Sequence, residues 1–196
     1  MAGFSTPQRA APRGFTLIEV LVVIVVIGVA AVSLITLSMR GSTQSAQALH
    51  EQQTHALAVA LLDEAESMPF TYCDPTDPLA ATATSAAGCT KPEVVGPEAG
   101  EVRLSATPLN NVNDYNGLVL AGGTLRDVAN QLLSTNLVQL TNCTARFTVQ
   151  PIALGAITVA SGDALHVSVL VQCPDYNVQS QVDGIRVRYA PNQYKY

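Results

Sequence analysis

The stretch from Val20 to Met39 constrains the fold most, because it contains no charged residue and consists mainly of Val, Ile, Leu and Ala. At about 1.5 Å per residue, a helix of this length spans roughly 30 Å, the hydrocarbon thickness of a bilayer. A helix in the core of a soluble protein is seldom apolar on every face over such a length. We therefore expect one membrane-spanning helix over residues 15–39.

A short basic leader, residues 1–14, precedes this helix. It contains Arg9 and Arg13 but no acidic residue, and such a segment normally stays on the cytoplasmic side of the membrane. The rest of the chain would then lie beyond the inner membrane. A secretory signal peptide has a similar layout, but its small-residue cleavage site follows the apolar part. Here Gly14 precedes the apolar part, so removal of the helix by signal peptidase is not expected.

The net charge of −5 at pH 7 argues against one class of partner. The Lys and Arg residues are few and scattered, so the chain lacks the basic surface that binds a phosphate backbone. We therefore expect no nucleic-acid binding.

Four cysteines lie beyond the expected membrane helix, and an even number in an exported domain is typical of disulfide bonds. Four cysteines allow three pairings. We favour a loop-closing Cys73–Cys89 bond and a Cys143–Cys173 bond between two strands. The alternative is zinc binding, but neither a CxxC pair nor a neighbouring histidine supports it.

The polar stretch that follows the membrane helix contains no proline before Pro69 and carries apolar residues at helical spacing, among them Leu57, Leu61 and Ala65. We therefore expect residues 40–69 to continue the helix in amphipathic form, with a globular domain covering its apolar side. Pro69 would end the helix, because the residue before a proline is disfavoured in the helical region.

Motifs for catalysis are absent from the chain or misleading. The stretch "HEQQTH" resembles the zinc-protease motif HExxH, but His50 and His55 are separated by about 140° around a helix and cannot share one metal ion. The chain has no GxSxG nucleophile elbow, and no glycine-rich loop for phosphate stands out. We expect a protein that is not an enzyme and that has no cofactor.

The segment 69–100 is rich in proline, glycine and small residues, which predicts irregular structure. Asp74 and Asp77 in this segment are candidates for calcium binding. Aspartates beside prolines are more often turn residues, however. We therefore expect no metal site.

Later stretches alternate apolar and polar residues, which is typical of strands. The pattern predicts strands over residues 101–107, 144–152, 165–173 and 184–190, and helical spacing favours a short helix within residues 123–135. An antiparallel sheet that packs on the long helix would bury the apolar faces of both. We expect an α+β fold in which residues 70–196 form a globular, β-rich domain.

Gly14 is followed by Phe-Thr-Leu-Ile-Glu and then by the apolar stretch. This order resembles the N-terminal signature of type IV pilins and pseudopilins. The resemblance implies that a prepilin peptidase cuts between Gly14 and Phe15 and methylates the new amine of Phe15. It also implies a filament in which Glu19 faces the amine of a neighbouring subunit. Many pilins have a proline near the position of Thr36, and its absence here means that no proline kink is expected.

Physical chemistry supports a role for Glu19. An ionised carboxylate in an apolar segment is costly and needs a partner, so it usually marks function. The amine freed on Phe15 is a cation that exists only after cleavage. Pairing this amine with Glu19 of the next subunit would set the stagger between helices. The alternative is that Glu19 reaches the lipid headgroups at the membrane edge.

Weaker similarity extends along the chain. The stretches "HALAVALLDEAESMPF", "CDPTDP", "NVNDYNGL" and "GIRVRYAPN" are similar to accessory pilins of the mannose-sensitive haemagglutinin pilus, the MshD type. This similarity implies a minor pilin-like subunit that enters or primes a pilus-type filament. The alternative is a minor pseudopilin of a type II secretion system, because the two groups share the N-terminal signature.

The same resemblance implies partners and a location. The partners would be other pilins, through the N-terminal helix, together with the prepilin peptidase and the inner-membrane assembly platform. The protein would cross the inner membrane once, with its C-terminal domain in the periplasm, and would reach the cell surface in the assembled pilus.

Overall fold

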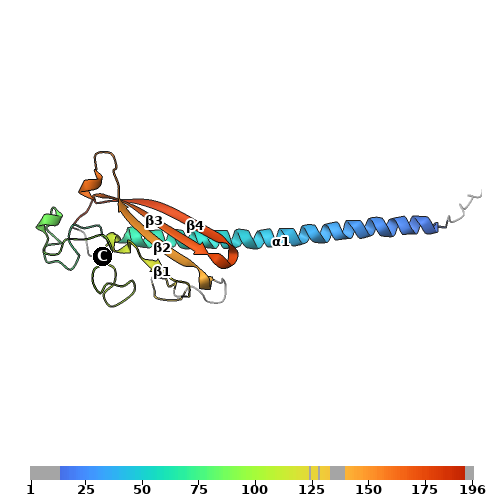
Figure 1. Cartoon of the computed structure of the whole chain (residues 1–196), viewed down its shortest axis with the longest axis horizontal. Helices are drawn as coiled ribbons and strands as arrows, with labels where there is room; N and C mark the ends of the chain where they lie inside the picture. The colour runs from blue at the N-terminus through green and yellow to red at the C-terminus, as the bar shows by residue number, and fades with distance from the viewer. Residues whose placement is uncertain (1–13, 124, 128, 133–139, 193–196) are drawn as a thin grey trace, which may run out of the picture. The chain divides into compact units, whose positions relative to one another are not determined.

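A computed structural model of the chain describes residues 14–123, 125–127, 129–132 and 140–192 (Figure 1). The expected leader, apart from Gly14, lies outside these residues. The chain divides into two compact units, Met1–Ala46 and Gln47–Tyr196. One helix, α1 (Leu17–Ser67), contributes residues to both units.

In the first unit, α1 carries apolar side chains on every face. Ile24, Ile27 and Leu34 are each more than half exposed. The hydroxyl groups of Ser33 and Thr36 donate to carbonyl oxygens of the same helix at 2.8 and 2.9 Å, so these polar groups do not require water. Among the described residues, α1 is the one helix that is long and apolar enough to cross a membrane.

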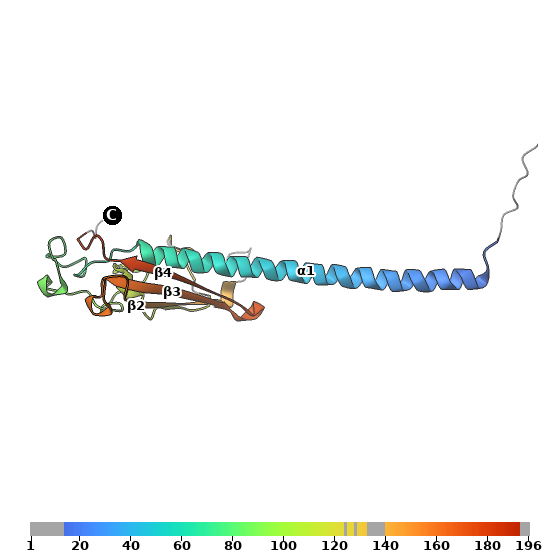
Figure 2. The same ribbon diagram turned by 90° about the horizontal axis from the view of Figure 1, so that it is seen from above.

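In the second unit, α1 lies along one face of a sheet (Figure 2). Leu57, Leu61 and Ala65 are buried, which confirms the predicted apolar stripe. Leu49, in contrast, is 52% exposed and lies outside the core. The helix ends at Ser67, two residues before Pro69, as the proline predicts.

Within the described residues, the sheet has four antiparallel strands in the order β1-β2-β3-β4. The strands are β1 (Val119–Leu120), β2 (Thr144–Pro151), β3 (Ala164–Cys173) and β4 (Val178–Val187). Short 3-10 turns connect them or flank them: η1 (Ala86–Gly88), η2 (Val112–Tyr115), η3 (Leu140–Asn142), η4 (Val159–Ser161) and η5 (Pro174–Tyr176). A long helix with an antiparallel sheet confirms the expected α+β fold.

The two central strands supply the side of the core that faces α1. In β3 the alternate residues Val167, Val169 and Val171 are fully buried, as period-two patterning predicts. Phe147 of β2 pairs with Val169 across the ladder and is buried with it. These residues and the apolar stripe of α1 form one hydrophobic cluster.

Helix α1 and β4 approach each other closely at Gly184. A Cβ atom at this position would collide with the carboxyl group of Glu66 on α1. Glycine in the interior of a strand often marks such a close approach of another element. The absence of a side chain at Gly184 therefore leaves room for the carboxyl group of Glu66 in this position.

The strand predicted over residues 101–107 is wrong. These residues form turns, and Leu104 has a backbone φ of 60°, which a strand does not allow. The guanidinium group of Arg103 is held by Glu64 of α1. A tertiary contact of this kind outweighs the local alternating pattern.

The helix predicted within residues 123–135 is not found among the described residues. Arg126 and Leu132 instead form an isolated antiparallel bridge. The carboxylate of Asp127 accepts the backbone N–H of Gln131 at 2.8 Å, and such local side-chain bonds compete with helix formation. Five of the predicted helix positions, 124, 128 and 133–135, lie outside the described residues.

The last strand also differs from the prediction of 184–190, because β4 begins at Val178 and ends at Val187. Arg188 leaves the sheet and donates to Asp163 at 2.7 Å. Its guanidinium group also lies 4.0 Å from the ring centre of Phe70. These contacts direct the chain away from the strand at this point.

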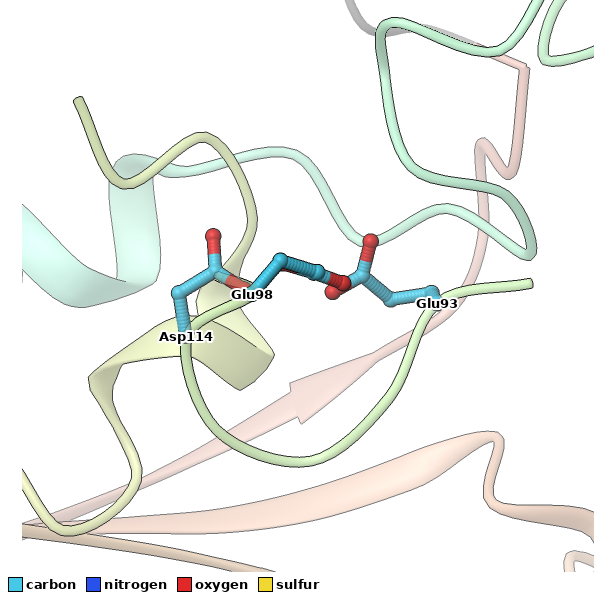
Figure 3. A group of neighbouring side chains, drawn as sticks. All are labelled: Glu93, Glu98 and Asp114. Atoms are coloured by element: carbon cyan, nitrogen blue, oxygen red, sulfur yellow. The ribbon is translucent and has the colours of Figure 1, made fainter. Parts of the chain in front are cut away.

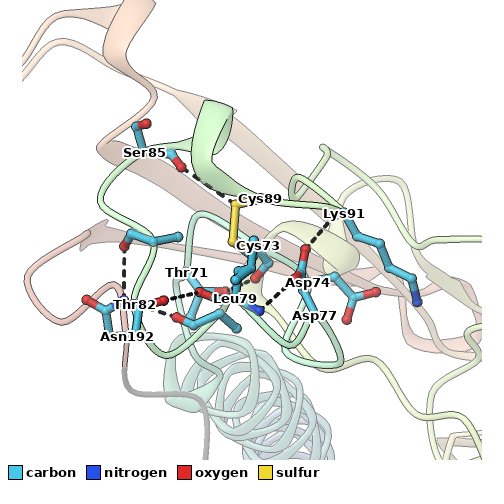
Figure 4. The surroundings of a disulfide bond; sticks show 12 residues. Thr71, Cys73, Asp74, Asp77, Leu79, Thr82, Ser85, Cys89, Lys91 and Asn192 are labelled. Atoms are coloured by element: carbon cyan, nitrogen blue, oxygen red, sulfur yellow. Dashed lines mark hydrogen bonds between the residues drawn. A yellow bond between two sulfur atoms is a disulfide. The ribbon is translucent and has the colours of Figure 1, made fainter.

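The segment after α1 is irregular, as expected, and a disulfide bond between Cys73 and Cys89 closes it (Figure 4). A second disulfide bond joins Cys143, just before β2, to Cys173 at the end of β3. Asn192 donates its amide to the carbonyl oxygens of Ala80 and Ala83 and so ties the C-terminal region to the first loop.

We expect Leu61→Ala to destabilise the second unit by about 2–5 kcal/mol, because it leaves a cavity under α1. Leu49→Ala, on the same helix but exposed, should change the free energy of unfolding by less than about 0.5 kcal/mol. Denaturant unfolding of the full chain measures both. Equal effects of the two substitutions would contradict this packing.

Candidate functional site

The residues expected to be processed lie at the start of α1. Gly14 and Phe15 precede the helix, and the Thr16 hydroxyl accepts a hydrogen bond from the backbone N–H of Glu19 at 3.3 Å. Threonine is a common N-cap residue, so Thr16 helps to begin the helix. Glu19 lies in the first turn, where the helix dipole favours a negative charge.

These N-terminal residues are exposed in the single chain. Phe15 is 81% exposed, and the carboxylate of Glu19 makes no hydrogen bond or ion pair with another described residue. The apolar side chains that follow are exposed on all sides as well. An apolar helix with this surface requires lipid or other apolar helices around it.

The two histidines of the "HEQQTH" stretch have different partners. The ring of His50 stacks on that of Tyr176, with ring centroids 3.6 Å apart. Nδ1 of His55 lies 3.1 Å from the hydroxyl oxygen of Ser180. Both histidines therefore contribute to the contact between α1 and the end of the sheet.

The structure places Asp74 and Asp77 in turns. Asp74 accepts the backbone N–H of Thr76 at 2.7 Å, and Asp77 accepts those of Leu79 and Lys91 (Figure 4). Burial opposes ionisation of Asp77, but the backbone N–H groups outweigh it and hold the pKa of Asp77 below its ordinary value. These are the local bonds of turn-forming aspartates.

Three other carboxylates, which no sequence pattern singles out, lie together (Figure 3). We call Glu93, Glu98 and Asp114 the acidic cluster. One oxygen atom from each lies within 4.8 Å of the others. Glu93 and Glu98 belong to the loop that follows the first disulfide bond, and Asp114 belongs to η2.

The carboxylate oxygens of the acidic cluster lack donors. Both oxygens of Glu93, both of Glu98 and Oδ1 of Asp114 are buried without a hydrogen-bond partner among the residues that the structure describes. The salt bridges of the described residues involve other acids, namely Glu64, Asp163 and Asp183. Buried carboxylates are normally paired or bound to a metal, so this arrangement is unusual for a protein.

The surroundings make ionisation of these groups unfavourable. Burial and the nearby carboxylates of Asp114 and Glu98 raise the pKa of Glu93 to about 10. Burial also raises the pKa of Asp114 to about 6, although backbone N–H groups partly oppose it. The neighbouring Glu101 has its pKa raised to about 8 by burial and by Glu98. Without a countercharge, these carboxyl groups therefore hold protons at a pH at which free carboxyl groups are ionised.

A second buried acid, Glu64 on α1, has the partners that the acidic cluster lacks. Arg103 donates from Nε and Nη2 to its two carboxylate oxygens at 2.7 and 2.6 Å. The hydroxyl group of Tyr115 donates to the same carboxylate at 2.9 Å. This network joins α1 to the loop that contains Arg103 and to η2, which contains Tyr115.

The sequence contains little signal for either arrangement. The acids of the cluster have no regular spacing, and the chain brings them together through an isolated bridge between Cys73 and Pro92 and through η2. Glu64 and Arg103 are far apart in the sequence. Only the many acids between residues 93 and 114, with a single arginine among them, could have drawn attention to this region.

We expect Glu64→Gln to lower the free energy of unfolding by about 3 kcal/mol, because it leaves the buried Arg103 without a countercharge. Glu51→Gln, an exposed position on the same helix, should change it by less than about 0.5 kcal/mol. Denaturant unfolding of the full chain provides the comparison. A small effect of Glu64→Gln would show that water or another acid compensates Arg103.

Comparisons with known proteins identify the N-terminal segment. Residues 9–35 match the family described as the prokaryotic N-terminal methylation motif. No curated protein matches the chain, and no solved structure does. The motif and the exposed apolar helix support a membrane-anchored type IV pilin-like or pseudopilin subunit that a prepilin peptidase processes and that assembles with other pilins.

Proposed function

We propose that this protein is a minor, accessory subunit of a type IV pilus-type filament, of the kind found in the mannose-sensitive haemagglutinin pilus. It is a structural protein, and its chemistry is assembly. The observation that carries the proposal is the methylation motif over residues 9–35, placed directly on an apolar helix.

The N-terminal helix lies in two environments in turn. Before assembly it anchors the chain in the inner membrane, with the second unit in the periplasm. During assembly it leaves lipid for a bundle of similar helices. Both surroundings are apolar, so the transfer itself contributes little free energy, and close packing and polar pairs must direct the association.

Glu19 supplies the polar pair. The helix that carries it has apolar side chains on every face, and a carboxylate at such a position needs a countercharge. Cleavage after Gly14 creates a cation on Phe15, four residues from Glu19. Within one chain Glu19 makes no ion pair among the described residues. The amine of a neighbouring subunit therefore sets the register between subunits.

The first test concerns processing. Coexpressed with a prepilin peptidase, the wild-type chain should lose residues 1–14 and carry an N-methyl group on Phe15, as mass spectrometry detects. Gly14→Leu should remain uncut, because a large side chain occupies the position before the scissile bond. Gly28→Ala, where a Cβ meets no atom within 4 Å, should be cut normally. A mature wild-type chain with another N-terminus would overturn the proposal.

The second test concerns register. Glu19→Val should be cleaved and methylated but should enter filaments at least about tenfold less, which corresponds to ~1.4 kcal/mol of lost pairing. Thr36→Val, also in the apolar segment, should enter them normally, because the Thr36 hydroxyl bonds to its own helix. Immunoblots of sheared filaments measure incorporation. Normal incorporation of Glu19→Val would exclude the Glu19–amine pair.

The identity of the filament is tested by copurification. Crosslinking of the processed full-length protein in its native membrane should capture subunits and platform proteins of a pilus. Capture of type II secretion components instead would place the protein among the minor pseudopilins.

A further inference from the structure

The acidic cluster is not explained by assembly, because it lies in the second unit, in the loops beyond the end of α1. Its members come from two segments: Glu93 and Glu98 from the loop after the first disulfide bond, and Asp114 from η2. Figure 3 shows their carboxyl groups converging on the same space. The question is what compensates their charge.

Asp114 shows that the arrangement is built rather than accidental. Its side chain is fully buried, and its Oδ2 atom accepts the backbone N–H groups of Asn110 and Asn111 at 2.8 and 2.7 Å. These two bonds fix the carboxylate in place. The Oδ1 atom is buried as well, but no described residue donates a hydrogen bond to it. A fixed, buried oxygen without a donor, beside two other carboxylates, points to a missing positive ligand.

The surrounding turn adds further oxygens of the same kind. Asn111 and Asn113 are 0% and 5% exposed, and within the described part of the chain the side-chain oxygen of each lacks a hydrogen-bond donor. Asn110 has an unpaired side-chain oxygen too. This part of the protein is therefore rich in acceptors and poor in donors, which a cation would correct and a bound anion would not.

We propose that Glu93, Glu98 and Asp114 bind a calcium ion. The candidate ligands are all oxygen atoms, with no histidine or cysteine among them, which selects a hard cation over zinc or copper. The ligands sit on irregular loops, and calcium accepts flexible geometries with six to eight oxygens, whereas magnesium requires a near-ideal octahedron. Carboxylates that repel one another without the ion would attract it together.

Glu101 acts as a positioning residue in this proposal. It accepts the backbone N–H of Glu98 at 3.2 Å and the side-chain amide of Asn110. Its carboxylate thus links the loop of Glu98 to the residues that precede η2. Asp74 and Asp77 do not belong to this group of carboxylates, and their oxygens are not among the buried oxygen atoms that lack a donor.

The ion would connect segments that are far apart in the sequence. The backbone N–H of Val112 donates to the carbonyl oxygen of Pro69, and the amide of Asn111 donates to the hydroxyl of Thr71, so η2 is bonded to the segment that directly follows α1. Calcium bound between η2 and the 93–98 loop would fasten that loop to the same point. Calcium should therefore stabilise the second unit.

The experiment uses the full-length protein in detergent, freed of metal with a chelator that is then removed. We expect isothermal titration to detect one calcium ion per chain, and ~1 mM calcium to raise the melting temperature by about 5 °C. Magnesium at the same concentration should have little effect. Absence of calcium binding by the folded wild-type protein would overturn the proposal, and an equal response to magnesium would overturn the assignment to calcium.

Glu98→Gln provides the sharper test, because it removes one charge and keeps the shape. We expect calcium affinity to fall at least about tenfold. We also expect opposite effects on the melting temperature: the variant should melt above wild type in chelator, where repulsion is relieved, and below it in calcium. Glu93→Gln should behave in the same way and serves if Glu98→Gln fails to fold.

Glu51→Gln is the matched control, since it removes one exposed charge from α1 and should leave calcium binding unchanged. If Glu98→Gln and Glu93→Gln stabilise the protein equally in chelator and in calcium, the acids are merely protonated groups, and the calcium site is disproved.

Discussion

The packing of the second half of α1 against the sheet is the contact on which the rest of the globular unit depends. Small residues allow it: Ala58 and Ala65 on the helix are fully buried, and Gly184 of β4 leaves room for Glu66. The sheet contributes alternate side chains of β2 and β3 to the same cluster. Arg103 attaches its loop to α1, and the Cys143–Cys173 disulfide bond joins the residue before β2 to the end of β3.

The charges of two groups of buried acids near this layer are compensated in different ways. Glu64 is compensated within the chain, by the bidentate Arg103 and by the hydroxyl of Tyr115. The acidic cluster has no such internal partner among the described residues, and its oxygens are buried without donors. The first arrangement is complete as it stands, whereas the second requires protons or a cation from solution. The N-terminal unit has a similar dependence, because its apolar helix needs lipid or other helices.

The sequence predicted well wherever one residue pattern dominated over a long stretch. The apolar segment, the buried stripe of the second half of α1 and the alternation in β3 all follow from local periodicity and appear in the structure. Prediction failed for residues 101–107 and for the described residues within 123–135, where the pattern was short. At Arg103 a tertiary ion pair determined the backbone, and at Asp127 local side-chain bonds did so. Short patterns are ambiguous because the conformational preference of a few residues contributes less free energy than one buried tertiary contact.

The amino-acid sequence by itself determined the long apolar helix, the methylation motif around Gly14 and Phe15, and the α+β class of the fold. These features depend on residues that are close to one another in the sequence. The acidic cluster and the partners of Glu64 were decided only by the tertiary structure. Their side chains come from segments separated by many residues, and the distances between such segments depend on how helix, sheet and loops pack, which no local pattern encodes.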